Sequence, residues 1–191
     1  MKEEQIVKSA RELFGRYGYK KVSMDEIAKN ASVTKRTVYK YFSSKEELLK
    51  YFIAEEVEQM KKIVERVERK NLDFFDAIHE IIYNLIKYTR KAKFLQVILK
   101  ESETFKEPVI LECLKTIDLE IQKYIKQKLV LAIEKDHIVV KDVDITAFLI
   151  YKMYMALMFE WTENSKKIDE KQVADNIVYI IKNGICKKGN E

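Results

Sequence analysis

Turn-forming residues are scarce in this chain, which contains four glycines and one proline among its 191 residues. Tight turns between β-strands depend largely on such residues for their backbone angles, so few hairpins could form here. Hydrophobic residues make up 47% of the chain and charged residues 35%. That mixture is typical of amphipathic helices around an apolar core and is too hydrophobic for a disordered chain. The sequence therefore predicts an all-α fold.

Three further features bear on where the protein acts. The two cysteines, Cys113 and Cys186, do not make the framework of a disulfide-rich protein, which favours a reducing compartment. Residues 1–14 lack the apolar stretch of a signal peptide. The most hydrophobic segment, residues 145–161, is interrupted by Lys152 and is shorter than the roughly 20 residues of a membrane-spanning helix. We expect a cytoplasmic protein with no membrane partner.

Positive charge is concentrated at the start of the chain. Residues 1–50 contain 12 lysines and arginines against 7 aspartates and glutamates, whereas residues 51–191 contain 24 of each sign. The net charge of +5 therefore lies entirely in the first quarter of the sequence. Such a concentration is typical of a surface that binds a polyanion, although a lysine-rich solvated surface would give the same count.

Apolar spacing and capping residues predict four helices in the first third of the chain. The first runs over residues 3–17. Ser23, followed three residues later by a glutamate, forms a capping-box pattern that starts a short second helix. Thr34 is a good N-cap for a third helix over residues 35–42, and Ser44 precedes a long fourth. Two short helices joined by a tight turn and braced by a longer one match the helix-turn-helix arrangement.

The predicted helix over residues 35–42 has an apolar face and a cationic face. Val38 and Phe42 are four residues apart and are expected to pack against the preceding helix. The opposite face is the one that would enter the major groove of DNA. Tyr39 and Tyr41 flank it with hydroxyl groups that suit phosphate oxygens. The outward residues are Lys35, Arg36, Thr37 and Lys40.

The stretch VSMDEIAKNASVTKRTVYKYFSSKEELL, residues 22–49, resembles the DNA-binding signature of the TetR family of transcriptional regulators, and ARELFGRYGYKKVS before it resembles the first helix of that family. The resemblance implies base contacts from the third helix, with Thr37 and Tyr39 at phosphates and the groove edge. It also implies that Lys45 lies on the DNA backbone. The residues assigned to DNA binding are Ser23, Thr34, Lys35, Arg36, Thr37, Tyr39, Lys40, Tyr41 and Lys45.

One position departs from the pattern of the family, because Ser32 stands where glycine is usual. The turn between the two short helices usually needs a positive φ. Glycine adopts that angle freely, whereas serine adopts it at a cost of about 1 kcal/mol.

Five more helical patterns follow, which gives nine helices in all, the number and order of the TetR architecture. The resemblance thus predicts a helix-turn-helix DNA-binding domain at residues 1–46 and a helical ligand-binding and dimerisation domain at residues 47–191. The later helices are expected within residues 72–94, over 94–103, from Pro108 to about Glu134, from a cap at Asp142 or Asp144 to Trp161, and from Glu170 to Ile185.

The helix over residues 145–161 is apolar nearly all the way round. A helix of that kind is buried on more than one side, and a second chain is one way to cover it. In the TetR family the last two helices form a four-helix bundle across a dimer. We therefore expect a homodimer through the last two helices. The alternative is a central core helix in a monomer.

Aromatic and methionine side chains gather on three of the later helices and suggest a small-molecule pocket. Its occupant would be a small hydrophobic or aromatic effector, with His79 and Glu160 as polar anchors. Each of these residues could equally be core packing. The predicted lining is Phe75, Ile78, His79, Ile82, Tyr83, Cys113, Ile117, Ile121, Tyr151, Tyr154, Met155, Met158 and Glu160.

No motif for catalysis, cofactor binding or metal binding is present in the sequence. The two histidines, His79 and His137, lack metal-ligand spacing, and there is no glycine-rich phosphate loop. Cys113 lies on an apolar stripe, where an inert thiol is expected. The helix-turn-helix pattern and the resemblance to the TetR family imply instead a DNA-binding repressor that binds a palindromic operator as a dimer and is released by a small hydrophobic ligand. The alternatives are a TetR-like regulator without an inducer, acting as an activator or controlled by a protein partner, and a helical interaction protein.

Overall fold

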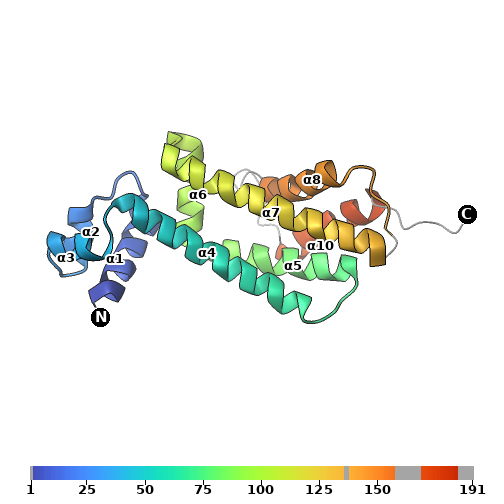
Figure 1. Cartoon of the computed structure of the whole chain (residues 1–191), viewed down its shortest axis with the longest axis horizontal. Coiled ribbons are helices and arrows are strands. Elements are labelled where there is room, and N and C mark those ends of the chain that lie inside the picture. Colours follow the sequence, from blue (N-terminus) through green and yellow to red (C-terminus); the bar gives the residue numbers. More distant parts are fainter. Residues whose placement is uncertain (1, 136–137, 158–168, 185–191) are drawn as a thin grey trace, which may run out of the picture. The chain divides into compact units, whose positions relative to one another are not determined.

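The structure, a computed structural model, describes residues 2–135, 138–157 and 169–184 (Figure 1). Nine helices lie within these residues, and the predicted all-α fold is confirmed. Their bounds are α1 (Lys2–Tyr17), α2 (Met24–Asn30), α3 (Lys35–Tyr41), α4 (Lys45–Glu68), α5 (Phe74–Thr89), α6 (Lys93–Phe105), α7 (Pro108–Lys135), α8 (Val143–Met155) and α10 (Glu170–Gly184).

Packing divides the chain into two units. Unit 1 consists of Met1–Gln59 and Thr89–Lys115, and unit 2 consists of Met60–Tyr88 and Thr116–Glu191. Helices α4 and α7 each contribute residues to both units. A packing unit is defined by contacts and not by function. The predicted functional division between residues 46 and 47 therefore remains a prediction.

The helix starts follow the capping residues that the sequence indicated. The Ser23 hydroxyl accepts a hydrogen bond from the backbone N–H of Glu26, and the Glu26 carboxylate accepts one from the backbone N–H of Ser23. Thr34 caps α3 by accepting from the N–H of Thr37, and Asp142 caps α8. Each such cap satisfies a backbone donor that the helix itself cannot, and contributes about 1 kcal/mol.

Three predicted helix ends differ from the structure or lie outside the described residues. Helix α3 ends at Tyr41, one residue early, because Phe42 turns to an extended backbone with φ −133° and ψ 114°. The predicted continuation of α8 to Trp161 and the predicted end of α10 at Ile185 lie outside the described residues.

Aromatic side chains from three helices build the core of unit 1. Phe14 of α1 is fully buried, and its ring meets the rings of Tyr19 and Phe52 edge-on, with centroids 5.6 and 5.9 Å apart. Phe52 of α4 also meets Phe94 of α6 at 5.5 Å. Edge-to-face pairs contribute about 0.5–1.5 kcal/mol each beyond the burial of their surface. They fix α1 against the first half of α4 and against α6.

Unit 2 has its own apolar core, to which α5, α7, α8 and α10 contribute. Hydrogen bonds join its helices at the margin of this core: the Tyr124 hydroxyl donates to Glu68 at 2.7 Å, and His79 lies 2.7 Å from Asp175. The buried side chains of the cluster are Phe74, Phe75, Ile82, Ile86, Leu129, Ala132, Ile138, Ala147, Ile150, Val173, Ala174, Ile177 and Ile181.

The turn between α2 and α3 has the backbone shape that the sequence predicted. Ser32 lies in the left-handed region with φ 54°. The N–H of Ser32 donates to the carbonyl of Lys29, and the N–H of Val33 donates to the carbonyl of Ala28. These bonds close the end of α2, so the strained serine belongs to a defined cap.

Replacing Ser32 with glycine should therefore leave the protein as stable or make it more stable, by up to about 1 kcal/mol, because glycine adopts positive φ without a Cβ clash. Denaturant unfolding of Ser32→Gly beside Ser32→Ala measures this directly. Alanine keeps the Cβ and should not stabilise the turn. A clear loss of stability in the glycine variant would contradict this explanation of the turn.

Candidate nucleic-acid interface

Helix α3 is held in place by its apolar residue and by its neighbours in unit 1. Val38 of α3 and Ile27 of α2 are fully buried. Helix α2 is in turn tied to α1, because the Ser9 hydroxyl donates to the carbonyl of Ile27 at 3.1 Å and Asn30 donates to the Ser9 oxygen at 3.0 Å. In Figure 1 these three helices lie together at the N-terminal end of the chain. We refer to α1, α2 and α3 as the head.

The predicted base-reading residues share the solvent-facing side of α3. Lys35, Arg36 and Lys40 are exposed, and Tyr39 is 44% exposed. Lys35 forms an ion pair of 2.7 Å with Asp25 of α2, and the hydrogen bond to that carboxylate raises the pKa of the Lys35 ammonium. The face thus presents cations and one exposed aromatic hydroxyl beside each other, which is the chemistry that DNA phosphates and base edges require.

Four other predicted residues have structural contacts or lie at the margin of this face. The hydroxyl of Thr37 lies 2.9 Å from that of Thr34, and both belong to the cap of α3. Ser23 is the cap of α2. Tyr41, the last residue of α3, is 38% exposed. Contacts of these side chains with DNA remain predictions.

Lys45 has a larger structural role than the sequence indicated. Its ammonium donates to the carbonyls of Tyr19 and Val22, each at 2.9 Å, and lies 4.3 Å from the centroid of the Tyr19 ring. Burial lowers the pKa of this ammonium. Two of its three N–H groups are therefore engaged within unit 1, and a contact with the DNA backbone would use the third.

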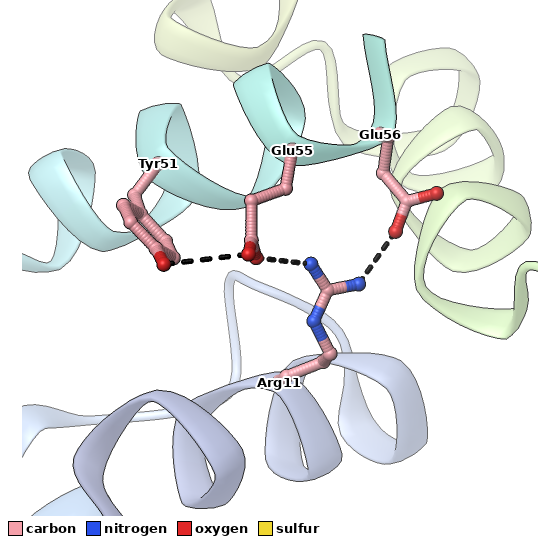
Figure 2. A network of polar contacts seen from close by, with 4 residues as sticks. All are labelled: Arg11, Tyr51, Glu55 and Glu56. Atoms are coloured by element: carbon pink, nitrogen blue, oxygen red, sulfur yellow. Dashed lines mark hydrogen bonds and ion pairs between the residues drawn. The ribbon is translucent and has the colours of Figure 1, made fainter. Parts of the chain in front are cut away.

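Sequence reasoning did not find the Arg11 network that joins α1 to α4 (Figure 2). The Arg11 guanidinium bridges two carboxylates of α4, at 2.5 Å to Glu56 and 2.7 Å to Glu55. It also lies 4.8 Å from the centroid of the Phe52 ring. Tyr51 donates to Glu55 at 3.3 Å. The two Arg11–carboxylate contacts each span more than 40 residues of sequence, so local spacing gave no signal for them.

The residues predicted to line an effector pocket are mostly parts of the unit 2 core. Phe75 and Ile82 belong to the buried cluster, and Ile78, Tyr83 and Tyr154 pack against it. Tyr151 is buried and donates a hydrogen bond to Asp118. Its burial, and to a smaller extent this hydrogen bond, raises the pKa of its hydroxyl. The remaining described residues, Ile117, Ile121 and Met155, are partly buried.

Three polar residues of that predicted pocket need separate comment. His79 is engaged with Asp175, which competes with a role as ligand anchor. Cys113 belongs to unit 1, unlike the other described members of the set, and burial raises the pKa of its thiol, as expected for an inert cysteine. Glu160 lies outside the described residues, as does Met158.

Among residues 2–135, 138–157 and 169–184, histidine, cysteine and carboxylate side chains do not gather in groups of three or more that could hold a metal ion. None of the helices in this part of the chain has the length and apolar character needed to cross a bilayer.

Comparison with known proteins finds a protein-family match in the same region of the chain. The model of the family described as "Bacterial regulatory proteins, tetR family" matches residues 6–52, which include α2, α3 and most of α1. The uncharacterized HTH-type transcriptional regulator YhgD of Bacillus subtilis is 27% identical over 182 residues, and the match covers 95% of each chain. The HTH-type transcriptional regulator UidR of Escherichia coli is 26% identical over 128 residues, which cover 65% of this chain and 63% of that one.

Solved structures extend the likeness to nearly the whole chain. A Clostridium perfringens protein proposed to regulate fatty acid metabolism has 25% sequence identity and a TM-score of 0.74, and the match covers 96% of this chain and 100% of that one. A γ-butyrolactone receptor has the same fold at 18% identity, with a TM-score of 0.71 and coverage of 96% and 87%. The match over the head and the likeness of these relatives along the chain support a transcriptional regulator of the TetR family, and the curated relatives are named as transcriptional regulators.

Proposed function

We propose that this protein is a cytoplasmic repressor that binds a palindromic operator as a homodimer and is released by a small hydrophobic ligand. The observation that carries the DNA-binding part is the exposed face of α3, where Lys35, Arg36, Tyr39 and Lys40 project from a helix whose other side is buried. A helix held in this way can enter the major groove without rearrangement of its own packing.

The exposed side chains of α3 are proposed to have two roles, base recognition and phosphate binding. Lys35, Arg36 and Lys40 carry long cationic side chains that reach base edges, and arginine and lysine pair best with guanine. Tyr39 carries one hydroxyl, which suits a phosphate oxygen. Base contacts decide which sequence is bound, whereas phosphate contacts set the affinity for every sequence.

Substitutions on α3 should therefore separate into two classes. Lys35→Ala and Lys40→Ala should each change the preferred base at one position of a selected duplex, with a loss of about 1–3 kcal/mol on the original sequence. Tyr39→Phe should weaken binding to all duplexes by a similar factor and leave the preferred sequence unchanged. Selection from random duplexes, followed by fluorescence titration of the selected ones, measures both.

Lys141→Ala is the matched control, because it removes the same charge from an exposed position of unit 2. It should leave both affinity and preference unchanged. If all four variants behaved alike, or if the wild-type protein bound every duplex equally, the proposed reading role of α3 would be wrong.

The dimer proposal depends on apolar side chains that unit 2 leaves uncovered. Helix α8 buries Ile150 on one side and exposes Leu149, at 52%, on another. Helix α10 likewise buries Ile177 and exposes Ile180 and Tyr179, the last at 69%. The two helices contact each other, and both expose apolar side chains. A second copy of the chain would cover them, as the TetR resemblance implies, and exposed apolar side chains gathered on neighbouring helices are typical of an interface.

Leu149→Glu should therefore raise the dissociation constant of the dimer at least 100-fold, because a carboxylate would be buried without a partner in an apolar interface. Sedimentation equilibrium over a range of protein concentrations measures the constant. Leu119→Glu on α7 is the control, since Leu119 is 60% exposed and the change is chemically identical. A wild-type protein that is monomeric at micromolar concentration would contradict the proposal.

The effector proposal is supported by composition and by the relatives. Tyr83 of α5 and Met153 and Tyr154 of α8 pack against the unit 2 core, and such residues adapt to apolar ligands. The C. perfringens relative is described as acting in fatty acid metabolism, which fits an apolar effector. Helix α4 contributes residues to both units and is the proposed route by which ligand would shift the head between two states. The alternative is a regulator without an inducer.

A panel of fatty acids and aromatic acids should contain a compound that stabilises the DNA-free protein to heat and weakens operator binding at least tenfold. A tenfold effect corresponds to a coupling of about 1.4 kcal/mol between ligand and DNA. Ile121→Trp should abolish the effect by filling the pocket, whereas Leu119→Trp, on the exposed side of the same helix, should not. Compounds that stabilise the protein without changing DNA affinity would favour the regulator without an inducer.

A further inference from the structure

Two successive backbone N–H groups in the turn between α1 and α2, those of Tyr19 and Lys20, bind the same side chain. Helix α1 ends where the N–H of Gly18 donates to the carbonyl of Phe14 at 2.9 Å. Gly18 then takes φ +86°, in the left-handed region. A residue of this conformation at a helix end turns the next N–H groups, those of Tyr19 and Lys20, away from the helix axis. Successive N–H groups in such a turn form a concave site that binds anions.

The anion in this site is a side chain from α6. One carboxylate oxygen of Glu101 accepts a hydrogen bond from the N–H of Tyr19 at 2.6 Å, and the other accepts from the N–H of Lys20 at 3.1 Å. Glu101 is 6% exposed, which is unusual for a glutamate, and it lies more than 80 residues from the turn in sequence. Charge-assisted bonds of this kind are roughly twice as strong as neutral ones.

Gly18 is required at this position for a second reason besides its backbone angle. A Cβ atom at residue 18 would lie 2.4 Å from a carboxylate oxygen of Glu101 and 2.7 Å from its carboxyl carbon. Cβ atoms do not approach non-bonded atoms this closely, so a side chain at this position would require the Glu101 carboxylate to shift. The glycine and the glutamate therefore form one fitted pair.

Lys45 supplies the opposite charge on the other side of the same turn. Its ammonium donates to the carbonyls of Tyr19 and Val22, so the N–H groups of the turn face an anion and its carbonyls face a cation. The end of α1 carries the negative end of the helix dipole, which disfavours a carboxylate there, and the nearby ammonium offsets that repulsion. Lys20 adds an ion pair of 3.0 Å with Glu107.

We propose that Glu101 is a positioning residue for DNA recognition, which it serves by holding the α1–α2 turn and through it the orientation of α3. The turn leads directly to Val22, which is buried, and to Ser23, which caps α2. Helix α2 contacts α3, and Ile27 of α2 and Val38 of α3 are both fully buried. We refer to the Glu101 carboxylate and the Tyr19 and Lys20 N–H groups that it binds as the latch. The positioning role depends on the proposed DNA binding by the head, but the latch itself is testable without DNA.

The test uses the full-length protein with Glu101→Gln, which keeps the shape of the side chain. The amide offers one oxygen acceptor, and its NH2 group meets the second backbone N–H without bonding to it. Amide hydrogen exchange followed by NMR should become at least tenfold faster at Tyr19 and Lys20 and remain unchanged in the core of unit 2. The affinity for a selected operator should fall at least tenfold, with the dependence of affinity on salt unchanged because no phosphate contact is removed.

Glu103→Gln, an exposed position on the same helix, is the control and should change neither measurement. Gly18→Ala approaches the latch from the other side, because it displaces the intact carboxylate, and should reproduce both effects. If Glu101→Gln failed to fold, two other measurements would still test the latch. They are the exchange rates of the Tyr19 and Lys20 amides in the wild-type protein, and the amide exchange and operator affinity of Gly18→Ala.

Fast exchange of both amides in the wild-type protein would overturn the latch. Faster exchange in Glu101→Gln with operator affinity within twofold of wild type would overturn the positioning role. A wild-type protein that bound no duplex, while its Tyr19 and Lys20 amides remained protected, would contradict the proposed function and leave the latch as a structural feature.

Discussion

The ring of Phe52 is the point on which unit 1 depends. It is fully buried on α4 and meets the rings of Phe14 on α1 and Phe94 on α6, so one side chain joins three helices that are distant in sequence. The Arg11 guanidinium lies over the same ring while it bridges Glu55 and Glu56. A buried carboxylate such as that of Glu56, 4% exposed, is tolerated in a core because its charge is paired and hydrogen-bonded there.

The head needs such support because its helices are short. Helices α2 and α3 have seven residues each, and isolated helices of this length do not form in water. Their caps at Ser23 and Thr34 contribute locally, but their orientation comes from tertiary contacts. A base-reading helix must be placed accurately relative to the groove, so the packing that orients α3 is part of the DNA-binding function rather than a background to it.

Local signals in the sequence were enough to predict the helices and the cationic face of α3. Capping residues and apolar spacing act over three or four residues, so the box at Ser23 could be predicted from local sequence, whereas the positive φ at Ser32 was implied by the glycine usual there in the TetR family. The Glu101 latch could not be predicted from local sequence, because its partners are more than 80 residues away. A glutamate in an amphipathic helix is also expected to face solvent. Lys45 was assigned to the DNA backbone by the resemblance to the TetR family, and its two bonds to turn carbonyls become visible only with the fold. The predicted effector lining shows a further limit: residues such as Ile82 that pack a core have the same composition as residues that line a cavity.

Recognition of particular DNA sequences by the exposed face of α3 can be tested by genome-wide recovery of DNA crosslinked to the native protein. We expect a small set of enriched sites that share an inverted repeat, with half-sites one helical turn or a multiple of it apart. Recovery spread evenly over the genome, or enriched sites without a shared repeat, would contradict it.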